Sequence, residues 1–362
     1  MQYQLKTRQV CLFFIAFLPL AKLFMMPSVM AGKANEDMWM CALINLALDF
    51  LTAFIILKTT SKTDKNVYQL LEGKVGKGGT KFIMCLFFVY FLLKSLLPIN
   101  EQKEYVIRTL YTLTPTLLYF LPFFFVCFYF CTKPLRVIGR ASDVLWLITS
   151  LGIIILLCLS IGNFELSALL PVGANGIANV IEGSYATLTW FGDGLYLLFF
   201  MGEFSYRKKD NLKILGCYLL GALAVMVFVI VFYCVFTSIA FRQRFALTEI
   251  SKYSTVINNI GRFDYIGIMM ILFSNIFALS IPLFFSAKIL SYIFSIKKKW
   301  VSPLIVVLFH AFVIIFLYQR IHGIEVFIMK FTGWFFLLTA NILPIIICLT
   351  AKKEKGYAIK EN

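Results

Sequence analysis

Hydrophobic residues dominate this chain in runs of roughly 17 to 25, separated by short polar linkers. A helix of that length crosses about 30 Å of hydrocarbon, so each run predicts one membrane-spanning helix. The ten predicted spans cover residues 9–30, 38–57, 80–98, 115–131, 143–161, 184–202, 212–240, 264–294, 302–319 and 331–350. Because no linker is long enough for a separate soluble domain, we expect residues 1–362 to form one all-α transmembrane domain.

Two of these runs contain residues that interrupt a helix. The first holds Pro19 and Pro27, and the sixth holds the stretch Trp190-Phe191-Gly192-Asp193-Gly194. Interruptions at corresponding places in the two halves of a membrane protein are typical of a transporter fold with a buried small-solute site. A simpler alternative is that the two prolines only kink a packed helix.

Three ionisable residues are predicted to share the middle of the membrane. Lys22 lies about 15 Å below the outer boundary by helical rise, and Asp49 and Asp193 lie about ten residues into their spans. A lone charge at that depth costs roughly 2.5 to 3.5 kcal/mol on the insertion scale, which favours burial against a partner. We expect Lys22 to pair with Asp193 or Asp49, its ammonium taking the place of a coupling sodium ion. A purely structural ion pair is the alternative. Lys94, four residues from the outer end of its span, is expected to snorkel to the interface and to need no function.

Composition supports the membrane assignment and excludes several functions. The chain is 60% hydrophobic and 14% charged, with a net charge of +16. Linkers on the side of the N-terminus hold more than twice as many Lys and Arg as the opposite linkers, where Lys103 and Arg108 lie. This bias predicts that both termini are cytoplasmic and that the positive charge faces membrane lipids rather than a nucleic acid.

The sequence holds no sign of catalysis. We find no nucleophile with a partner histidine, no phosphate-binding glycine loop and no set of metal ligands, so we expect no enzyme activity, no cofactor and no metal. The first run carries Lys22 and two prolines, with no small-residue cleavage site after it, so we expect it to remain in the mature protein.

A series of short motifs extends along nearly the whole chain in a defined order. They are Pro27-Ser28, Ala31-Gly32, Asp37-Met38-Trp39, Thr114-Pro115 after Arg108, Gly139-Arg140, Leu169-Leu170-Pro171-Val172, Asn175-Gly176-Ile177, Glu182-Gly183-Ser184 and Phe191-Gly192. In this order the chain resembles the spore germination permeases, the membrane-embedded B subunits of nutrient germinant receptors. That family belongs to the amino acid, polyamine and organocation transporter superfamily.

The resemblance implies a LeuT-type architecture, in which helices one to five and six to ten form inverted repeats and the first and sixth helices are broken. It also implies a receptor in the inner membrane of the spore, with a larger A subunit and a lipoprotein C subunit as partners. The ligand would be a small nutrient germinant, with an amino acid expected because half-helix ends can hold both a carboxylate and an amine.

The candidate ligand-binding residues are Ala21, Lys22, Leu23, Phe24, Trp190, Phe191, Gly192, Asp193 and Gly194, with Lys22, Asp49 and Asp193 as a charge network. Gly192 and Gly194 are expected to leave the backbone open to a ligand. The first break lacks the glycines usual in this superfamily, so Lys22 itself could hold the ligand carboxylate. Two alternatives to a receptor stay open: a proton-coupled amino acid permease, and a scaffold with a vestigial pocket.

Overall fold

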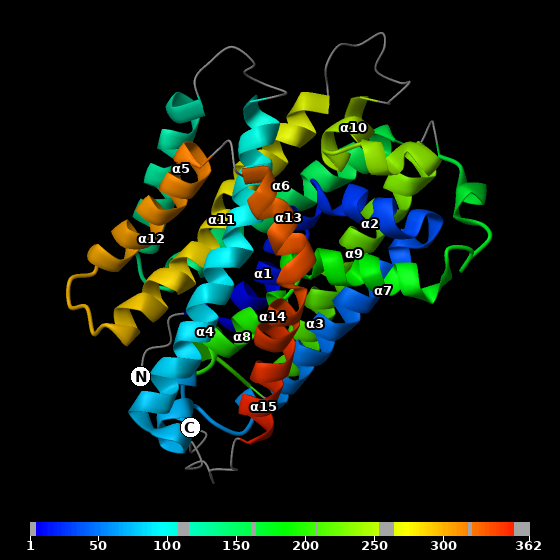
Figure 1. Ribbon diagram of the computed structural model, residues 1–362. Helices are drawn as coiled ribbons and strands as arrows, with labels where there is room; N and C mark the ends of the chain where they lie inside the picture. The colour runs from blue at the N-terminus through cyan, green and yellow to red at the C-terminus, as the bar shows by residue number, and fades with distance from the viewer. Residues whose placement is uncertain are drawn as a thin grey trace.

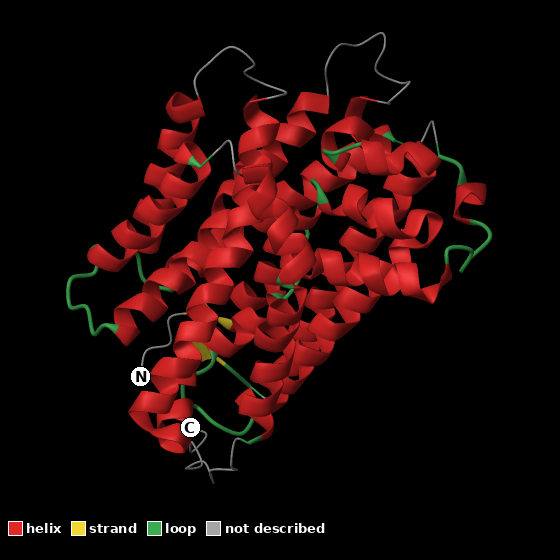
Figure 2. Ribbon diagram, viewed as in Figure 1, coloured by secondary structure: helices red, strands yellow, loops and turns green. Residues whose placement is uncertain are grey.

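The computed structural model describes residues 5–107, 116–160, 164–207, 209–252, 264–317 and 321–350, and nearly all of them are helical (Figure 2). The first half contains β1 (Leu5–Lys6), α1 (Thr7–Phe17), η1 (Leu20–Lys22), α2 (Met26–Ala34), η2 (Asn35–Asp37), α3 (Met38–Thr60), α4 (Val67–Tyr105), α5 (Thr116–Cys131) and α6 (Arg136–Leu159). The middle contains η5 (Leu166–Leu169), α7 (Gly176–Thr187), η6 (Leu188–Trp190), η7 (Asp193–Leu195), α8 (Tyr196–Phe200), β2 (Phe204–Ser205), α9 (Asp210–Phe236), η8 (Thr237–Arg242) and α10 (Ala246–Lys252). The last part contains α11 (Asp264–Ile293), α12 (Val301–Ala311), η10 (Phe312–Phe316), α13 (Ile321–Phe331), α14 (Gly333–Leu337), η12 (Leu338–Ile342) and α15 (Leu343–Leu349).

The long helices overlap the predicted spans, whereas α7, α10 and α13 lie largely or wholly outside them. Within the described residues, five helical stretches are long and apolar enough to cross a membrane, and a bent pair, Gly323–Phe331 with Gly333–Leu349, forms a sixth with a 57° bend. Two shorter apolar helices, Phe120–Cys131 and Val301–Phe316, lie on the fourth and ninth predicted spans. The two broken segments lie on the remaining spans, the first and the sixth.

The broken segments lie inside the bundle and run in opposite directions. α1 packs against α6 and α9, while α8 packs against α3 and η7. β1, before α1, pairs with β2, after α8, in a short parallel sheet. At the other end α2 packs against α7. Figure 1 shows α1 and α8 behind α4 and α14, near the middle of the bundle. The two breaks therefore meet at mid-height, as inverted repeats require.

One buried carboxylate joins two of the sequence motifs. The side chain of Asp37 accepts hydrogen bonds from the backbone N–H of Gly173 (2.7 Å) and of Asn175 (3.2 Å), directly before α7 begins. A carboxylate at the start of a helix is stabilised by the free amides and the helix dipole. Asp37 thus ties the outer half of the first segment to the start of the sixth. The motif Thr114-Pro115 and Arg108 lie outside the described residues.

α4 extends beyond its predicted span, and the assignment of Lys103 to an outer linker was wrong. The polar residues Asn100 to Glu104 continue the helix to Tyr105, and Lys103 is fully buried. On the basis of sequence, five consecutive polar residues predict a loop in water. The fold instead buries them, and Arg244, just before α10, bridges Glu104 (3.0 Å) and Glu325 of α13 (3.2 Å).

Candidate functional site

The first break contains no glycine and holds a buried lysine. α1 ends at Phe17, one 3₁₀ turn follows at Leu20–Lys22, and α2 begins at Met26 with Pro27 in its first turn. Proline suits that position because its missing N–H would have no partner there. The ammonium of Lys22 donates to the free carbonyl of Leu18 (2.7 Å) and pairs with the carboxylate of Asp193. The lysine therefore fills the space that the unwound turn opens.

The sixth break depends on two glycines that pack against neighbouring helices. Gly192 has a left-handed φ of +87°, and a Cβ there would collide with the Tyr90 hydroxyl and lie 2.9 Å from the Cβ of Ala340. A Cβ on Gly194 would lie 2.6 Å from the carbonyl oxygen of Asp49. These glycines allow close approach of α3, α4 and η12 to the break. The space beside each glycine, where a Cβ would stand, is thus occupied by the protein's own helices.

Asp49 satisfies the amides that this break frees. One carboxylate oxygen of Asp49 accepts hydrogen bonds from the N–H groups of Gly192 (2.8 Å) and Asp193 (2.9 Å). These amides stand at the start of η7, which continues into α8. Asp49 is 1% exposed, so the bonds are shielded from water. A ligand carboxylate could bind these amides only by displacing Asp49.

Lys94 belongs to the same charge cluster, so the expectation that it snorkels outward was wrong. Its ammonium lies 3.2 Å from Asp193 and donates to the carbonyl of Phe191. The residue is only 6% exposed. Asp193 is thus bridged by two ammonium groups, one from each of α4 and the first break. The sequence placed Lys94 near a helix end, and only the longer α4 puts it at the depth of Asp193.

Glu101 plays for the first broken segment the part that Asp49 plays for the sixth, and no sequence pattern indicated this role. Its carboxylate accepts hydrogen bonds from the Trp190 indole N–H (2.7 Å) and from the backbone N–H of Met25 (3.3 Å), the residue before α2. Glu101 is 1% exposed. Both second halves of the broken helices therefore begin against a buried carboxylate from a neighbouring helix. This arrangement is electrostatically favourable because each helix N-terminus carries a partial positive charge.

The backbone carbonyls of Leu23 and Phe24 bond to α10 and not to the sixth break. Their carbonyls accept hydrogen bonds from the N–H groups of Leu247 (3.1 Å) and Ala246 (3.0 Å) at the start of α10. Both side chains are buried, and the Phe24 ring packs edge-on against Tyr105. The carbonyls that the break exposes at these two positions are therefore already bonded to the protein.

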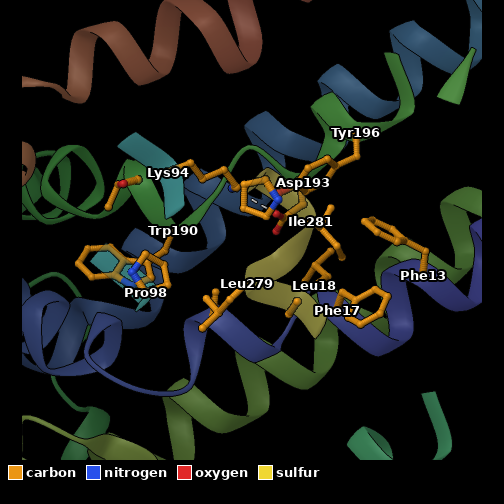
Figure 3. A pocket seen from close by; sticks show the side chains of 14 residues that line it. Phe13, Phe17, Leu18, Lys94, Pro98, Trp190, Asp193, Tyr196, Leu279 and Ile281 are labelled. Carbon is orange, nitrogen blue, oxygen red and sulfur yellow. Dashed lines mark ion pairs between the residues drawn. The ribbon is translucent and has the colours of Figure 1, made fainter. Parts of the chain in front are cut away.

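A small cavity lies between the two breaks (Figure 3). It has a volume of about 30 Å³, enough for about two water molecules, and its wall is mainly apolar. Its lining includes the polar side chains of Lys94, Asp193 and Thr189 and the polar-tipped rings of Trp190 and Tyr196, and the hydroxyl of Thr189 is buried without a hydrogen-bond partner. In Figure 3 Lys94 reaches toward Asp193 on one side, while Phe13 and Phe17 lie on the other.

Of the predicted ligand-binding residues, the structure brings Ala21, Trp190 and Asp193 to the wall of this cavity. Lys22 lies behind Asp193, with its ammonium 5.2 Å from the centre of the Phe191 ring. Within the described part of the chain, no group of three or more His, Cys, Asp or Glu residues is placed to hold a metal ion.

Comparison with known proteins agrees with this architecture. The manganese transporter of Eremococcus coleocola, bound to an aromatic bis-isothiourea compound, superimposes with a TM-score of 0.60 at 12% identity, covering 96% of this chain and 81% of that one. MhsT in complex with L-phenylalanine superimposes with a TM-score of 0.59 at 11% identity, covering 96% and 98%. At this level of identity the likeness shows the shared fold, an all-α membrane fold of the LeuT type.

Sequence comparison identifies the family. The chain is 24% identical over 212 residues to spore germination protein YndE of Bacillus subtilis (strain 168), a match that spans 58% of this chain and 58% of that protein, less than two thirds of its length. A family model described as "Spore germination protein" matches residues 4–324. The chain therefore belongs to the spore germination protein family of integral membrane proteins.

Proposed function

We propose that this protein is the membrane subunit of a spore germinant receptor, and that it binds a small nutrient between its two broken helices. The observation that carries the proposal is the cavity between the two breaks, where Asp193, paired with Lys22 and Lys94, and the unbonded hydroxyl of Thr189 lie together. Membership of the spore germination family supports the process, and the fold supports a solute site at this place.

The site chemistry favours an amino acid held by its carboxylate at a lysine. Asp49 and Glu101 already occupy the free amides of the two half-helices, so backbone amides are taken. Lys22 and Lys94 are two ammonium groups that share one carboxylate, that of Asp193. The carboxylate of a bound amino acid would supply the second negative charge that balances the two lysines. The amine would bind Asp193, and the apolar wall would hold a small hydrophobic side chain.

Binding requires the bundle to open. A cavity of about 30 Å³ is smaller than any amino acid, so it has to widen before an amino acid can enter. A ligand can shift the protein toward an open or signalling state only by the difference in its affinity for the two states. We propose that rocking of the broken helices conveys occupancy to an A subunit and a lipoprotein C subunit, in the inner spore membrane with both termini cytoplasmic.

Ligand binding by the purified chain tests this proposal. We expect one or a few amino acids from a full panel to raise the thermal unfolding midpoint, and Lys22→Met to abolish the rise. Lys33→Met is the matched control because Lys33 forms an exposed ion pair with Glu182, and neither residue lines the cavity. If Lys22→Met protein is made at normal levels and spores carrying it respond normally to the germinant, Lys22 has only a structural role.

A proton-coupled amino acid permease is the second candidate, because Asp193 and two lysines at the breaks could carry a coupling charge. Counterflow of labelled amino acid in proteoliposomes that hold this chain alone separates the two. Flux supports the permease, whereas ligand binding without flux supports the receptor. Absence of both would leave the chain as a scaffold with a vestigial pocket.

A further inference from the structure

A basic groove lies away from the central cavity, where α5 and α11 end and α12 begins. It is lined by Lys133 from the turn after α5, Lys288 from the last turns of α11 and Lys299 just before α12. Its volume is about 340 Å³, which is ample for a phosphate group with a glycerol. The end of α11 and the start of α12, which line the groove, lie toward the same end of the bundle as the start of α4 (Figure 1).

The three ammonium groups lack anionic partners within the described residues. Lys133 lies over the Tyr129 ring at 4.0 Å and Lys288 over the Phe284 ring at 4.6 Å, both from ammonium to ring centre. Aromatic faces orient an ammonium but leave its charge unneutralised. Glu203 acts on Lys288 through its charge without forming an ion pair. Three like charges that share one groove repel each other, so an anion bound there would be strongly favoured.

Exposed apolar side chains lie on α12, whose residues Ser302 and Pro303 line the groove. α12 and the π-helical turn after it expose one stripe, Ile305, Leu308, Phe309 and Phe312, each about half exposed. The spacing of three and four residues places these side chains on one helix face. A ligand that fits both features has an anionic head and a long apolar tail.

We infer that this groove binds the phosphate headgroup of an anionic phospholipid, with an acyl chain along the exposed stripe of α12. Lysine ammonium groups donate charge-assisted hydrogen bonds to phosphate oxygens and are attracted to an anionic leaflet. The stripe favours a lipid over free phosphate. A bound lipid would join α5, α11 and α12 at their ends.

The experiment measures how lipid stabilises the full chain after it has been delipidated in detergent. We expect phosphatidylglycerol to raise the unfolding midpoint, phosphatidylcholine to have little effect, and the triple variant Lys133→Gln/Lys288→Gln/Lys299→Gln to reduce the rise at least threefold. The control is Lys58→Gln/Lys77→Gln/Lys209→Gln, which removes the same charge from exposed positions elsewhere. Glu203→Gln should enlarge the rise, because it removes a negative charge that acts on Lys288.

A second measurement needs no variant. In the wild-type protein, phosphatidylglycerol should protect Lys133, Lys288 and Lys299 from an amine-acetylating reagent, as read by mass spectrometry, while Lys58 and Lys77 stay reactive. Equal protection at all five lysines, or equal loss of stabilisation in both triple variants, would show general surface attraction and overturn the inference. Full stabilisation by inorganic phosphate alone would assign the groove to a free anion, and protection by poly-glutamate but not by the lipid would assign it to an acidic protein segment.

Discussion

The two breaks at the centre of this protein solve one problem with different residues. The sixth segment unwinds at Gly192 and Gly194, where the missing Cβ atoms let neighbouring helices approach the backbone. The first segment unwinds between two prolines, and the long side chain of Lys22 fills the opening. Both second halves nevertheless begin against a buried carboxylate, Glu101 or Asp49. The comparison teaches that a freed helix end needs an electrostatic partner, whichever residues create the break.

Asp193 joins the two breaks, so its loss should have the largest effect. Asp193→Asn would leave two buried ammonium groups without their shared carboxylate, and we expect a loss of about 3 to 5 kcal/mol in unfolding free energy. Thermal unfolding in detergent measures it. The double variant Lys22→Met/Asp193→Asn should lose less than the two single variants combined, because the unpaired lysine is gone. Additive losses would show that Lys22 and Asp193 do not interact.

Gly192→Ala should lower the free energy of unfolding by roughly 2 to 4 kcal/mol, because it disturbs the packing of the sixth break. A left-handed φ costs a non-glycine residue about 1 to 3 kcal/mol, and the new methyl group would collide with the Tyr90 hydroxyl. Adding Tyr90→Phe should restore part of the loss by removing that hydroxyl. Gly216→Ala in α9 is the control, since nothing lies within 4 Å of its added Cβ. Similar midpoints for the variants at Gly192 and Gly216 would contradict the packing role.

The two capping carboxylates should be equivalent. Glu101→Gln and Asp49→Asn each keep shape but lose the charge that faces a helix N-terminus, and each should cost about 1 to 3 kcal/mol. Parallel thermal unfolding of both variants checks this. A large loss at one position and none at the other would show that only that break depends on an internal carboxylate.

The smallest effect is expected where α10 covers the first break. Ala246→Pro removes the N–H that bonds the carbonyl of Phe24, yet proline is tolerated in the first position of a helix, so α10 should remain. We expect a loss of about 0.5 to 1.5 kcal/mol. Amide hydrogen exchange of residues 23–26 should rise in this variant. Unchanged exchange would mean that α10 does not hold the first break in place.

The pairing of Lys22 with Asp193 and the two breaks could be anticipated from the sequence. The pairing follows from the depth of both residues in the membrane, and the breaks follow from the local chemistry of glycine and proline. A lysine and an aspartate counted to the same level of the membrane have few partners available there, and glycine and proline interrupt helices wherever they stand. Glu101 could not be anticipated, since it lies in a polar stretch that resembles an outer loop. The position of Lys94 was misjudged for the same reason, because the true length of α4 was hidden.

The sequence by itself determined the membrane-spanning helices, the two interruptions and the family, because hydrophobic length, helix breakers and motif order are properties of neighbouring residues. Only the tertiary structure decided which groups pair with each buried charged side chain. It placed α4 beside both breaks, gave Asp49 and Glu101 to the helix ends, turned Leu23 and Phe24 toward α10, and left the basic groove beside α12 without a carboxylate partner within the described residues. Those contacts join residues far apart in the chain, and burial in a low-dielectric interior makes each of them energetically important.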